Sequence, residues 1–491
     1  MRNKLLIKRV LLVILMTTLS LPVIQRQFNL IKEKPLQGSF HTVSANLRDS
    51  LTVVAWFNGN LQREADQDAD GKLGFRNSLI RLHNQIDYSF FKKINAEGVV
   101  CGKKNELFEE DYIKAFLGDF FVGEKVWKDK ARKLKAIQDT LSKLNKDLVV
   151  IFEPGKGTVY SDRFPENYKG KLKDVSNNDV FLSELKLNNV HVLDLNAYFV
   201  QLREKDPNRI FPRGGTHWSY YGAARAADTS LRYLKQLTNR QIPLFTIPKV
   251  VRCEEPRHPD ADIWLAMNMI QSAPTDNLVS PVIKFETEVK PDTDVLVVGD
   301  SFYFNWLSDS IMFKAFRNCD FWYYNKHNWS REGAEVAVVS DLNWQQEIMK
   351  RDLIIIMITE RFHHNFAWNF DEQLYHYFYP EDINLLEAFA NNLRISNDQF
   401  MRLVDDAKVK KVSLEQRISM ESSYLLYEDH LKNPEKYTSR SDLVTIIMMS
   451  IRSTPDWLAK VEAKASEKNI SVDEMIRMDA EWIYNEKYGN Q

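Results

Sequence analysis

Continuous hydrophobic runs, each ended abruptly by polar residues, are the main pattern of this chain. Such runs are typical of parallel strands that are buried on both faces of a sheet. The stretches between them show helical periodicity, as in residues 124–145, where apolar side chains recur on one side. Strands that alternate with helices predict an α/β fold with a doubly wound parallel sheet flanked by helices. The four predicted strands are Leu148–Phe152, Val190–Leu193, Val295–Val298 and Leu353–Ile358.

Polar side chains follow all four predicted strands. In open α/β sheets, ligands and chemistry collect beyond the carboxyl ends of the strands, so these side chains are expected to share one site. After the third strand comes Gly299-Asp300-Ser301, in which a glycine turn lifts a small polar side chain clear of the sheet. Ser301 is therefore the candidate nucleophile. A serine after a glycine turn is also typical of a helix N-cap, and that alternative stays open.

The N-terminus has the pattern of an export signal. Four basic residues among the first nine precede an apolar run from about Val10 to Ile24. No small-residue cleavage site follows, which favours an uncleaved signal anchor over a cleaved signal. The basic residues lie on the N-terminal side, so the bulk of the chain is expected outside the cytoplasm, as a single-pass protein of the cell inner membrane with a periplasmic body.

Changes in composition suggest four regions. Residues 1–28 form the signal anchor, and residues 29–123 are expected to be a mostly helical extension. The strand–helix alternation occupies residues 124–378. Residues 379–491 are charged and helical, and their last two helices are expected to form an αα-hairpin, with a proline start at Thr454-Pro455 and a capping box at Ser471.

The bulk composition excludes some classes of function. The formal net charge is −1, from 66 basic and 67 acidic residues, which argues against a nucleic-acid partner. The 3 cysteines form no C-x-x-C pair and have no metal-ligand spacing. No metal and no other cofactor are expected. Aromatic residues make up 12% of the chain, which is compatible with a sugar-binding groove but also with an aromatic core.

His217, in the stretch Gly214-Gly215-Thr216-His217-Trp218, is the candidate base. Serine is a poor nucleophile at neutral pH and needs a base within hydrogen-bond reach. His217 lies just before Ser219, a predicted N-cap, and a helix N-terminus disfavours the charged imidazolium, as a general base requires. The alternative is a structural histidine packed beside Trp218.

Further candidates surround this pair. The oxyanion donors are expected to be the amides of Ser301 and Phe302, next to Gly299, with help from Tyr303 or Asn305. Arg361 follows the last strand and is expected either to bind a carboxylate-bearing sugar or to pair with a carboxylate such as Glu360. The remaining candidates for lining the cleft follow the first two strands and are Lys156, Tyr160 and Asp194.

These motifs together resemble the alginate O-acetyltransferase family, whose catalytic domain is SGNH-hydrolase-like. The resemblance covers about residues 50 to 370 and rests on the Pro-Gly-Lys…Tyr stretch after the first strand, Thr216-His217-Trp218, the VVGDSF strand and Glu360-Arg361. It implies a membrane-anchored or exported enzyme that acetylates a secreted polysaccharide. It also implies a membrane-bound O-acyltransferase as the partner that supplies acetyl groups, an acetylated Ser301 and His217 as the base.

One position departs from the family pattern. The family has Asp-x-His, whereas this chain has Gly215 in the place of the aspartate. Asp300 and Asp194 are the candidates to replace it, with Asp300 assigned to the catalytic set; otherwise the site is slow or inactive. The leading hypothesis is O-acetyl transfer to an extracytoplasmic polysaccharide through a serine acyl-enzyme. The alternatives are a carbohydrate O-acetyl esterase and a non-catalytic glycan-binding or scaffold subunit of a polysaccharide-modifying complex.

Overall fold

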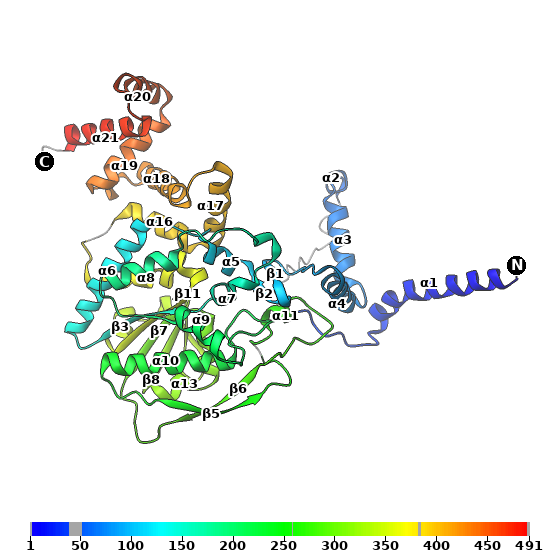
Figure 1. Cartoon of the computed structure of the whole chain (residues 1–491). Coiled ribbons are helices and arrows are strands. Elements are labelled where there is room, and N and C mark those ends of the chain that lie inside the picture. The colour runs from blue at the N-terminus through cyan, green and yellow to red at the C-terminus, as the bar shows by residue number, and fades with distance from the viewer. Residues whose placement is uncertain (1, 39–51, 258, 382–383, 489–491) are drawn as a thin grey trace.

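A mixed sheet forms the centre of the molecule (Figure 1). The computed structural model describes residues 2–38, 52–257, 259–381 and 384–488, and within them this sheet has seven strands in the order β10-β9-β8-β7-β11-β3-β4. Strands β8 to β4 run parallel to their neighbours, whereas β9 and β10 are antiparallel. The strands are β3 (Asp147–Glu153), β4 (Val192–Asp194), β7 (Asp294–Gly299), β8 (Asn318–Tyr323), β9 (His327–Trp329), β10 (Glu335–Val338) and β11 (Leu353–Thr359).

Alternate residues of the central strands enter two different cores. Val149 and Val297 belong to the core on one face, whereas Val150 and Val298 belong to the core on the other. Burial on both faces explains the continuous hydrophobic runs and confirms the predicted α/β class. Helices α9 (Leu195–Lys205), α10 (Tyr220–Thr238) and α12 (Phe304–Ser308) contribute to the first core, and α6 (Glu124–Lys143), α8 (Asn177–Leu187) and α15 (Phe370–Phe378) to the second.

The sequence predicts a wholly parallel sheet, and this is wrong at one edge, where β9 and β10 are antiparallel. After β8 the chain turns sharply at Tyr324 and Asn325, both of which have positive φ (54° and 50°). A turn of this handedness returns the chain directly beside β8, so β9 pairs with β8 in antiparallel register and leaves no room for a crossover helix.

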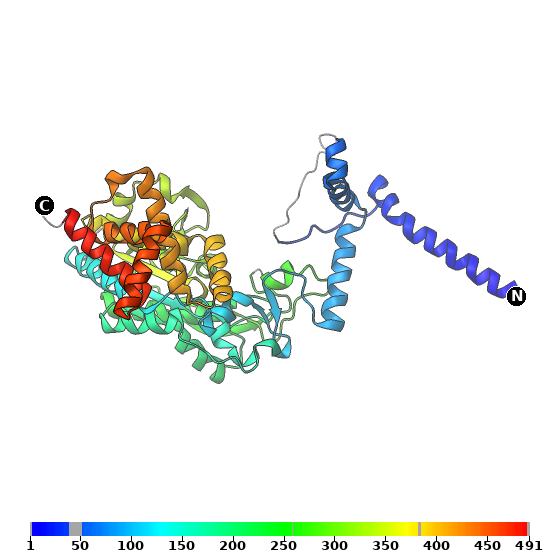
Figure 2. The same ribbon diagram turned by 90° about the horizontal axis from the view of Figure 1, so that it is seen from above.

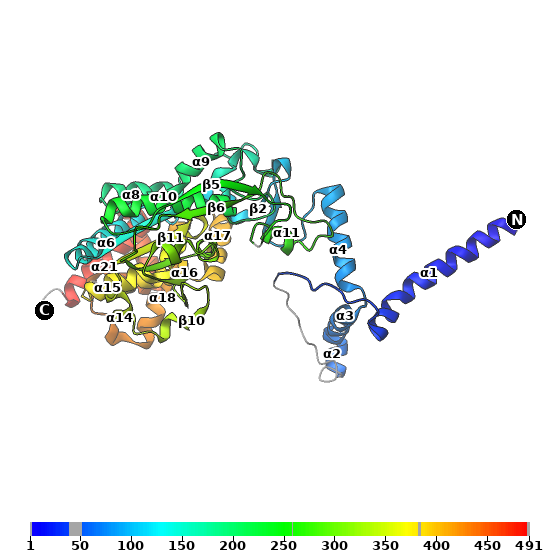
Figure 3. The same cartoon turned by 90° about the horizontal axis from the view of Figure 1, so that it is seen from below.

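The N-terminal region projects from the sheet domain. Helix α1 (Arg2–Phe28) contains a stretch, Leu6–Phe28, that is long and apolar enough to cross a membrane by length and composition, with a mean hydropathy of 1.9. The described termini lie at opposite ends of the molecule in both rotated views (Figures 2 and 3). Three further helices and a π-helical turn follow α1: α2 (Val53–Phe57), α3 (Asn60–Lys72), α4 (Arg76–Ile86) and Asp87–Phe91.

Two antiparallel strand pairs lie outside the central sheet. The first is a hairpin of β1 (Val99–Cys101) and β2 (Leu107–Glu109), and α5 (Glu110–Leu117) follows it into the first core. Strands β5 (Phe245–Arg252) and β6 (Val279–Phe285) form a separate antiparallel pair. The remaining helices of the sheet domain are α7 (Lys156–Val159), α11 (Asp262–Ala266), α13 (Ile311–Ala315) and α14 (Trp344–Met349).

The C-terminal region is helical, as predicted, and lies at one end of the sheet domain (Figure 1). Its first three helices pack on the second core, whereas the last two, joined by a turn at Asn469, form the predicted αα-hairpin with an apolar contact of their own. The helices are α16 (Leu385–Ile395), α17 (Asn397–Lys410), α18 (Leu414–Lys432), α19 (Arg440–Ser453), α20 (Pro455–Lys468) and α21 (Val472–Tyr488).

Candidate active site

Ser301 stands at the carboxyl end of β7, in the first residue of a 3-10 turn (Ser301–Tyr303) that leads into α12. Gly299, at the end of the strand, lies so close to β11 that a Cβ there would be 2.6 Å from the carbonyl oxygen of Met357. A glycine is thus required at the end of β7. The chain leaves the sheet in the turn that follows, and the half-buried Ser301 side chain lines a cavity.

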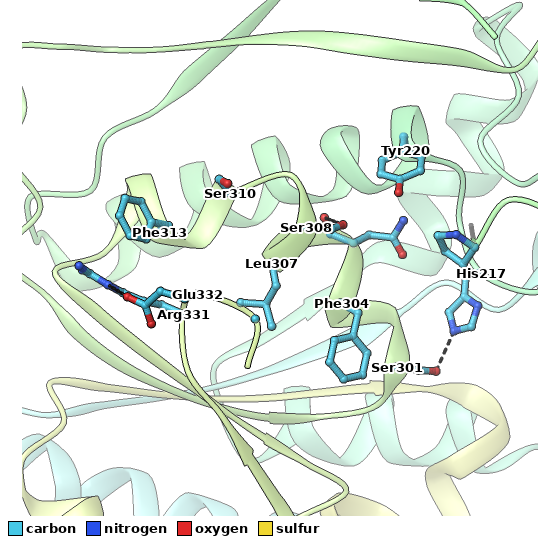
Figure 4. A pocket seen from close by; sticks show the side chains of 13 residues that line it. His217, Tyr220, Ser301, Phe304, Leu307, Ser308, Ser310, Phe313, Arg331 and Glu332 are labelled. Atoms are coloured by element: carbon cyan, nitrogen blue, oxygen red, sulfur yellow. Dashed lines mark hydrogen bonds and ion pairs between the residues drawn. The ribbon is translucent and has the colours of Figure 1, made fainter. Parts of the chain in front are cut away.

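His217 reaches Ser301 from the loop before α10. The Nε2 atom of His217 lies 2.7 Å from the Oγ atom of Ser301 (Figure 4). One further contact joins the two loops: Trp218 Nε1–H donates to the carbonyl of Phe302 at 3.2 Å. The hydroxyl of Ser219 caps α10 by accepting from the Gly222 amide at 3.0 Å, which fixes the end of the loop that carries His217. The N-cap prediction for Ser219 is confirmed, and the two predicted residues are within hydrogen-bond distance.

Asp262, at the start of α11, supplies the carboxylate that contacts the ring of His217. Its Oδ2 atom accepts from Nδ1 of His217 at 2.5 Å, and its Oδ1 atom accepts from the amides of Thr216 (2.8 Å) and Ile263 (2.7 Å). Burial disfavours the charged imidazolium, but the hydrogen bond and the charge of Asp262 outweigh it and raise the pKa of His217 above its ordinary value.

Gly215, where the family pattern has aspartate, has no room for a side chain. A Cβ at this position would lie 2.7 Å from Cγ of Pro212 and 2.9 Å from the carbonyl oxygen of Asp260. The loop that carries Asp260 and Asp262 thus occupies the space beside residue 215. The carboxylate on the imidazole comes from another segment of the chain, and the glycine accommodates that segment.

Neither carboxylate suggested from the sequence contacts the imidazole. Asp300 is fully buried and accepts from the amide of Phe302 (3.0 Å) and from the amide (3.0 Å) and hydroxyl (2.7 Å) of Thr359 on β11. These bonds fix the turn that carries Ser301, and none of them is to His217. Asp194 caps α9, where it accepts from the Asn196 amide at 3.0 Å.

Three predicted site residues are taken up by structural contacts. Tyr160 is buried beneath the guanidinium groups of Arg163, Arg203 and Arg209. Tyr303 is fully buried, with its hydroxyl 2.7 Å from the sulfur of Cys319. The Phe302 amide, expected as an oxyanion donor, is already bonded to the Asp300 carboxylate.

Lys156 anchors the loop that carries His217 and does not line the cavity beside Ser301. The side chain of Lys156 is 1% exposed. Its Nζ atom donates to the carbonyls of Pro212 (2.7 Å), Arg213 (3.2 Å) and Gly215 (2.8 Å). It also lies 3.2 Å from Glu106, a buried carboxylate. Burial lowers the pKa of Lys156 to about 8, although the Glu106 charge opposes the shift.

Replacing Lys156 with methionine is expected to lower the free energy of unfolding by about 3 kcal/mol, because the change leaves buried carbonyls and part of the Glu106 charge without a partner. Urea denaturation measures the loss. Lys128→Met, which removes only an exposed ion pair with Glu124 on α6, is the matched control and should change stability by less than about 0.5 kcal/mol. Equal losses in the two variants would contradict the anchoring role.

Asn305 on α12 is the remaining candidate for the oxyanion. Its side chain is 1% exposed, and among the described residues neither its amide nitrogen nor its amide oxygen has a hydrogen-bond partner. A buried amide without a partner is costly, so its retention is typical of a group that binds something else. Asn305 lines the same cavity as Ser301 and His217.

The cavity beside Ser301 has a volume of about 700 Å³. It extends from the Ser301–His217 pair along α12 toward Phe313 and Arg331 (Figure 4). A second cavity of about 730 Å³ opens on the other side of His217 and is lined by Asp262, Asn268 and Arg361, among others. Arg361 is ion-paired with Glu109 rather than with Glu360, and Glu360 instead accepts from the hydroxyl of Thr158.

Asp262 is the residue of the candidate site that the sequence did not reveal. It lies 45 positions after His217, and no strand-end motif precedes it. Its only local signal is an acidic residue at the start of a short helix, which is common in proteins.

Comparison with known proteins gives a family match over part of the chain. Residues 99–247 match the family model described as SGNH hydrolase-like domain, acetyltransferase AlgX. A curated relative, the probable alginate O-acetylase AlgJ of Pseudomonas putida, is 26% identical over 191 residues, which cover 39% of this chain and 48% of the relative. The chain thus spans about half the length of that relative. The predicted resemblance to the alginate O-acetyltransferase family is confirmed.

Three solved structures match part of this chain, each with a TM-score below 0.4. The O-acetyltransferase domain of Pseudomonas putida AlgJ matches with a TM-score of 0.39 and 18% identity, over 57% of this chain and 99% of that one. Pseudomonas aeruginosa AlgX matches with a TM-score of 0.34 and 18% identity, over 53% of this chain and 61% of that one. Bacillus cereus PatB1 matches with a TM-score of 0.35 and 10% identity, over 54% of this chain and 96% of that one.

Proposed function

We propose that this chain, which carries an AlgX-type SGNH hydrolase-like domain over residues 99–247, is an O-acetyltransferase that modifies an extracytoplasmic polysaccharide through an acetylated Ser301. The observation that carries the proposal is the continuous path from the Ser301 hydroxyl through His217 to Asp262. A hydroxyl, an imidazole and a carboxylate in this order form the arrangement that activates serine for acyl transfer.

The reaction has two stages that use the same groups. Nε2 of His217 takes the proton of Ser301 as Oγ attacks the acetyl carbonyl of the donor, and the collapse of the tetrahedral intermediate expels the leaving group, which takes that proton. In the second stage a sugar hydroxyl gives its proton to His217 and attacks the acetyl-serine. The Ser301 oxygen then leaves with the proton, and the acetyl ester remains on the sugar. Asp262 holds the Nδ1–H tautomer throughout.

The oxyanion in both stages needs donors beside Ser301. The backbone N–H of Ser301 and the side-chain amide of Asn305 are the two groups that we assign to it.

Asn305→Ala is expected to slow acetylation of Ser301 by about 10²–10³-fold, the usual effect of removing one oxyanion donor. Stopped-flow release of p-nitrophenol from p-nitrophenyl acetate measures it. Asn318→Ala, on the exposed start of β8, is the control and should react at the wild-type rate. A wild-type rate in Asn305→Ala would exclude this residue from the oxyanion site.

The geometry of the same site bears on the two alternative functions, an O-acetyl esterase and a non-catalytic subunit. The esterase shares the acetyl-serine and differs only in using water as the acceptor. The non-catalytic alternative depends on Gly215, which leaves residue 215 without a carboxylate for the imidazole, and the contact of Asp262 with His217 supplies one.

We further propose that α1 anchors the chain in the inner membrane with its body in the periplasm, and that a membrane-bound O-acyltransferase supplies acetyl groups.

The test uses the full chain in detergent, mixed with p-nitrophenyl acetate and then with an oligosaccharide. Peptide mass mapping is expected to find one acetyl group on the peptide that contains Ser301. Added saccharide should speed its loss and become acetylated. Loss of the acetyl group at a rate that saccharide does not change would indicate an esterase. A folded protein that forms no adduct would overturn the proposal.

A further inference from the structure

A strip of half-buried aromatic side chains runs along the carboxyl edge of the sheet. Tyr323 and Tyr324 stack with ring centroids 4.0 Å apart. Tyr324 lies 4.7 Å from Trp368 and 5.5 Å from Phe362, and the last two rings are 5.6 Å apart. We call these four residues the aromatic strip. It extends from the margin of one core to the margin of the other, across the end of the sheet.

The aromatic strip adjoins the candidate nucleophile. The amide of Tyr324 donates to the carbonyl of Gly299 at 3.0 Å, two residues before Ser301. At one end of the strip, Tyr323 contacts Phe304, at a centroid distance of 5.1 Å, and Phe304 lines the cavity beside Ser301 (Figure 4). At the other end, the Arg361 guanidinium lies 4.6 Å from the Phe362 ring and lines the second cavity with His217.

The backbone of the strip is held in an unfavourable conformation. Tyr324 (φ 54°) and Trp368 (φ 48°) both lie in the left-handed region, where bulky residues are rare. The side-chain amide of Asn325 donates from Nδ2 to the carbonyl of Trp368 at 3.0 Å and joins the two turns. Strain of this kind persists where the surroundings over-determine it, and it gathers at ligand sites.

We propose that the aromatic strip is a saccharide subsite, on which pyranose rings of the acceptor polysaccharide stack so that a ring hydroxyl is presented to Ser301. The inference rests on the proposed function. A pyranose has an apolar C–H face and a hydroxyl rim, so an aromatic ring buries the face and leaves the rim in water. Rings in an extended row fit a polymer better than a small acyl donor, which needs only the cavity beside Ser301.

The test compares variants that remove an aromatic face while keeping the turn. Tyr324→Asn and Trp368→Asn suit it, because asparagine tolerates positive φ. Trp368→Phe keeps an aromatic face and serves as the conservative variant. Tyr424→Ala, on α18 with Tyr424 47% exposed, removes an aromatic side chain far along the chain from the strip.

Two measurements use the full chain in detergent. Saturation-transfer NMR detects binding of hexasaccharides from alginate, cellulose and chitin. The loss of the acetyl group from Ser301 is then followed at increasing concentrations of the hexasaccharide that binds. We expect the half-saturating concentration to rise about tenfold in the two asparagine variants, to recover in Trp368→Phe and to stay unchanged in Tyr424→Ala. Acetylation of Ser301 by p-nitrophenyl acetate should stay the same in all four.

The outcomes separate the two proposals. Absence of the acetyl adduct in wild-type protein would overturn the proposed function, while NMR would still judge the strip. An adduct whose response to saccharide is the same in the asparagine variants and in Tyr424→Ala would overturn the strip alone. So would the absence of saturation transfer from all three hexasaccharides to the wild-type protein.

Discussion

Ser301→Ala is expected to form no acetyl adduct and to lose ester turnover by a factor of about 10⁶, the cost of removing the nucleophile from a serine protease. The reason is that Oγ of Ser301 is the atom on which His217 acts, at 2.7 Å from its Nε2. Without it, neither stage of the transfer has an acyl carrier. Intact-mass spectrometry after mixing with p-nitrophenyl acetate and the steady-state release of p-nitrophenol measure the two losses.

The fold should survive this change. The turn is held by Asp300, which bonds Phe302 and Thr359, and none of these contacts uses the Ser301 hydroxyl. The thermal midpoint is therefore expected to match that of the wild type. Ser308→Ala, which removes an exposed hydroxyl from the same cavity, should keep the adduct. An adduct of undiminished yield in Ser301→Ala would place the acetyl group on another residue and contradict the mechanism.

The sequence predicted the centre of the sheet because burial leaves a strong pattern there. Strands β3, β7 and β11 are covered on both faces, so their apolar runs are unbroken. Strand β8, Asn318–Tyr323, was missed because it mixes polar with aromatic residues. The antiparallel edge was also missed, because its turn at Tyr324 and Asn325 carries no glycine signal and places a bulky tyrosine, which rarely adopts positive φ, at its first position.

The site was predicted only as far as its residues carry local signals. Ser301 follows a strand and a glycine, and His217 precedes a capped helix, so each is visible within a few positions. Asp300 has the same local signal as Ser301, yet its side chain turns into the sheet toward Thr359, which only the strand order brings beside it. Asp262 contacts His217 through a fold-back of the chain across 45 positions, and no single-sequence pattern reports such a contact.

Asp262→Asn is expected to lower kcat for ester turnover by about 10⁴-fold, the effect of the corresponding change in a serine protease. An amide in this place offers N–H as well as oxygen to Nδ1, and so no longer selects the tautomer whose Nε2 accepts the serine proton.

The charge of Asp262 also raises the pKa of His217. His217 acts as a base only when neutral, so the wild-type rate should fall as the pH drops through that raised pKa. In Asp262→Asn the residual rate should fall at a lower pH. A pH–rate profile measures both effects.

Two further variants make this test specific to the Asp262 contact. Asp260→Asn changes a neighbouring carboxyl whose pKa burial raises to about 7, and the rate should stay within about threefold, because amide and protonated acid are alike in charge. Adding Gly215→Asp to Asp262→Asn should restore nothing, since a Cβ at 215 would lie 2.7 Å from Pro212 and 2.9 Å from the Asp260 carbonyl oxygen. Rescue by that second change would mean that the loop yields and that the position of the family aspartate is still usable. Equal losses in Asp260→Asn and Asp262→Asn would instead mean that the loop acts through its overall charge, and not through one hydrogen bond to the ring.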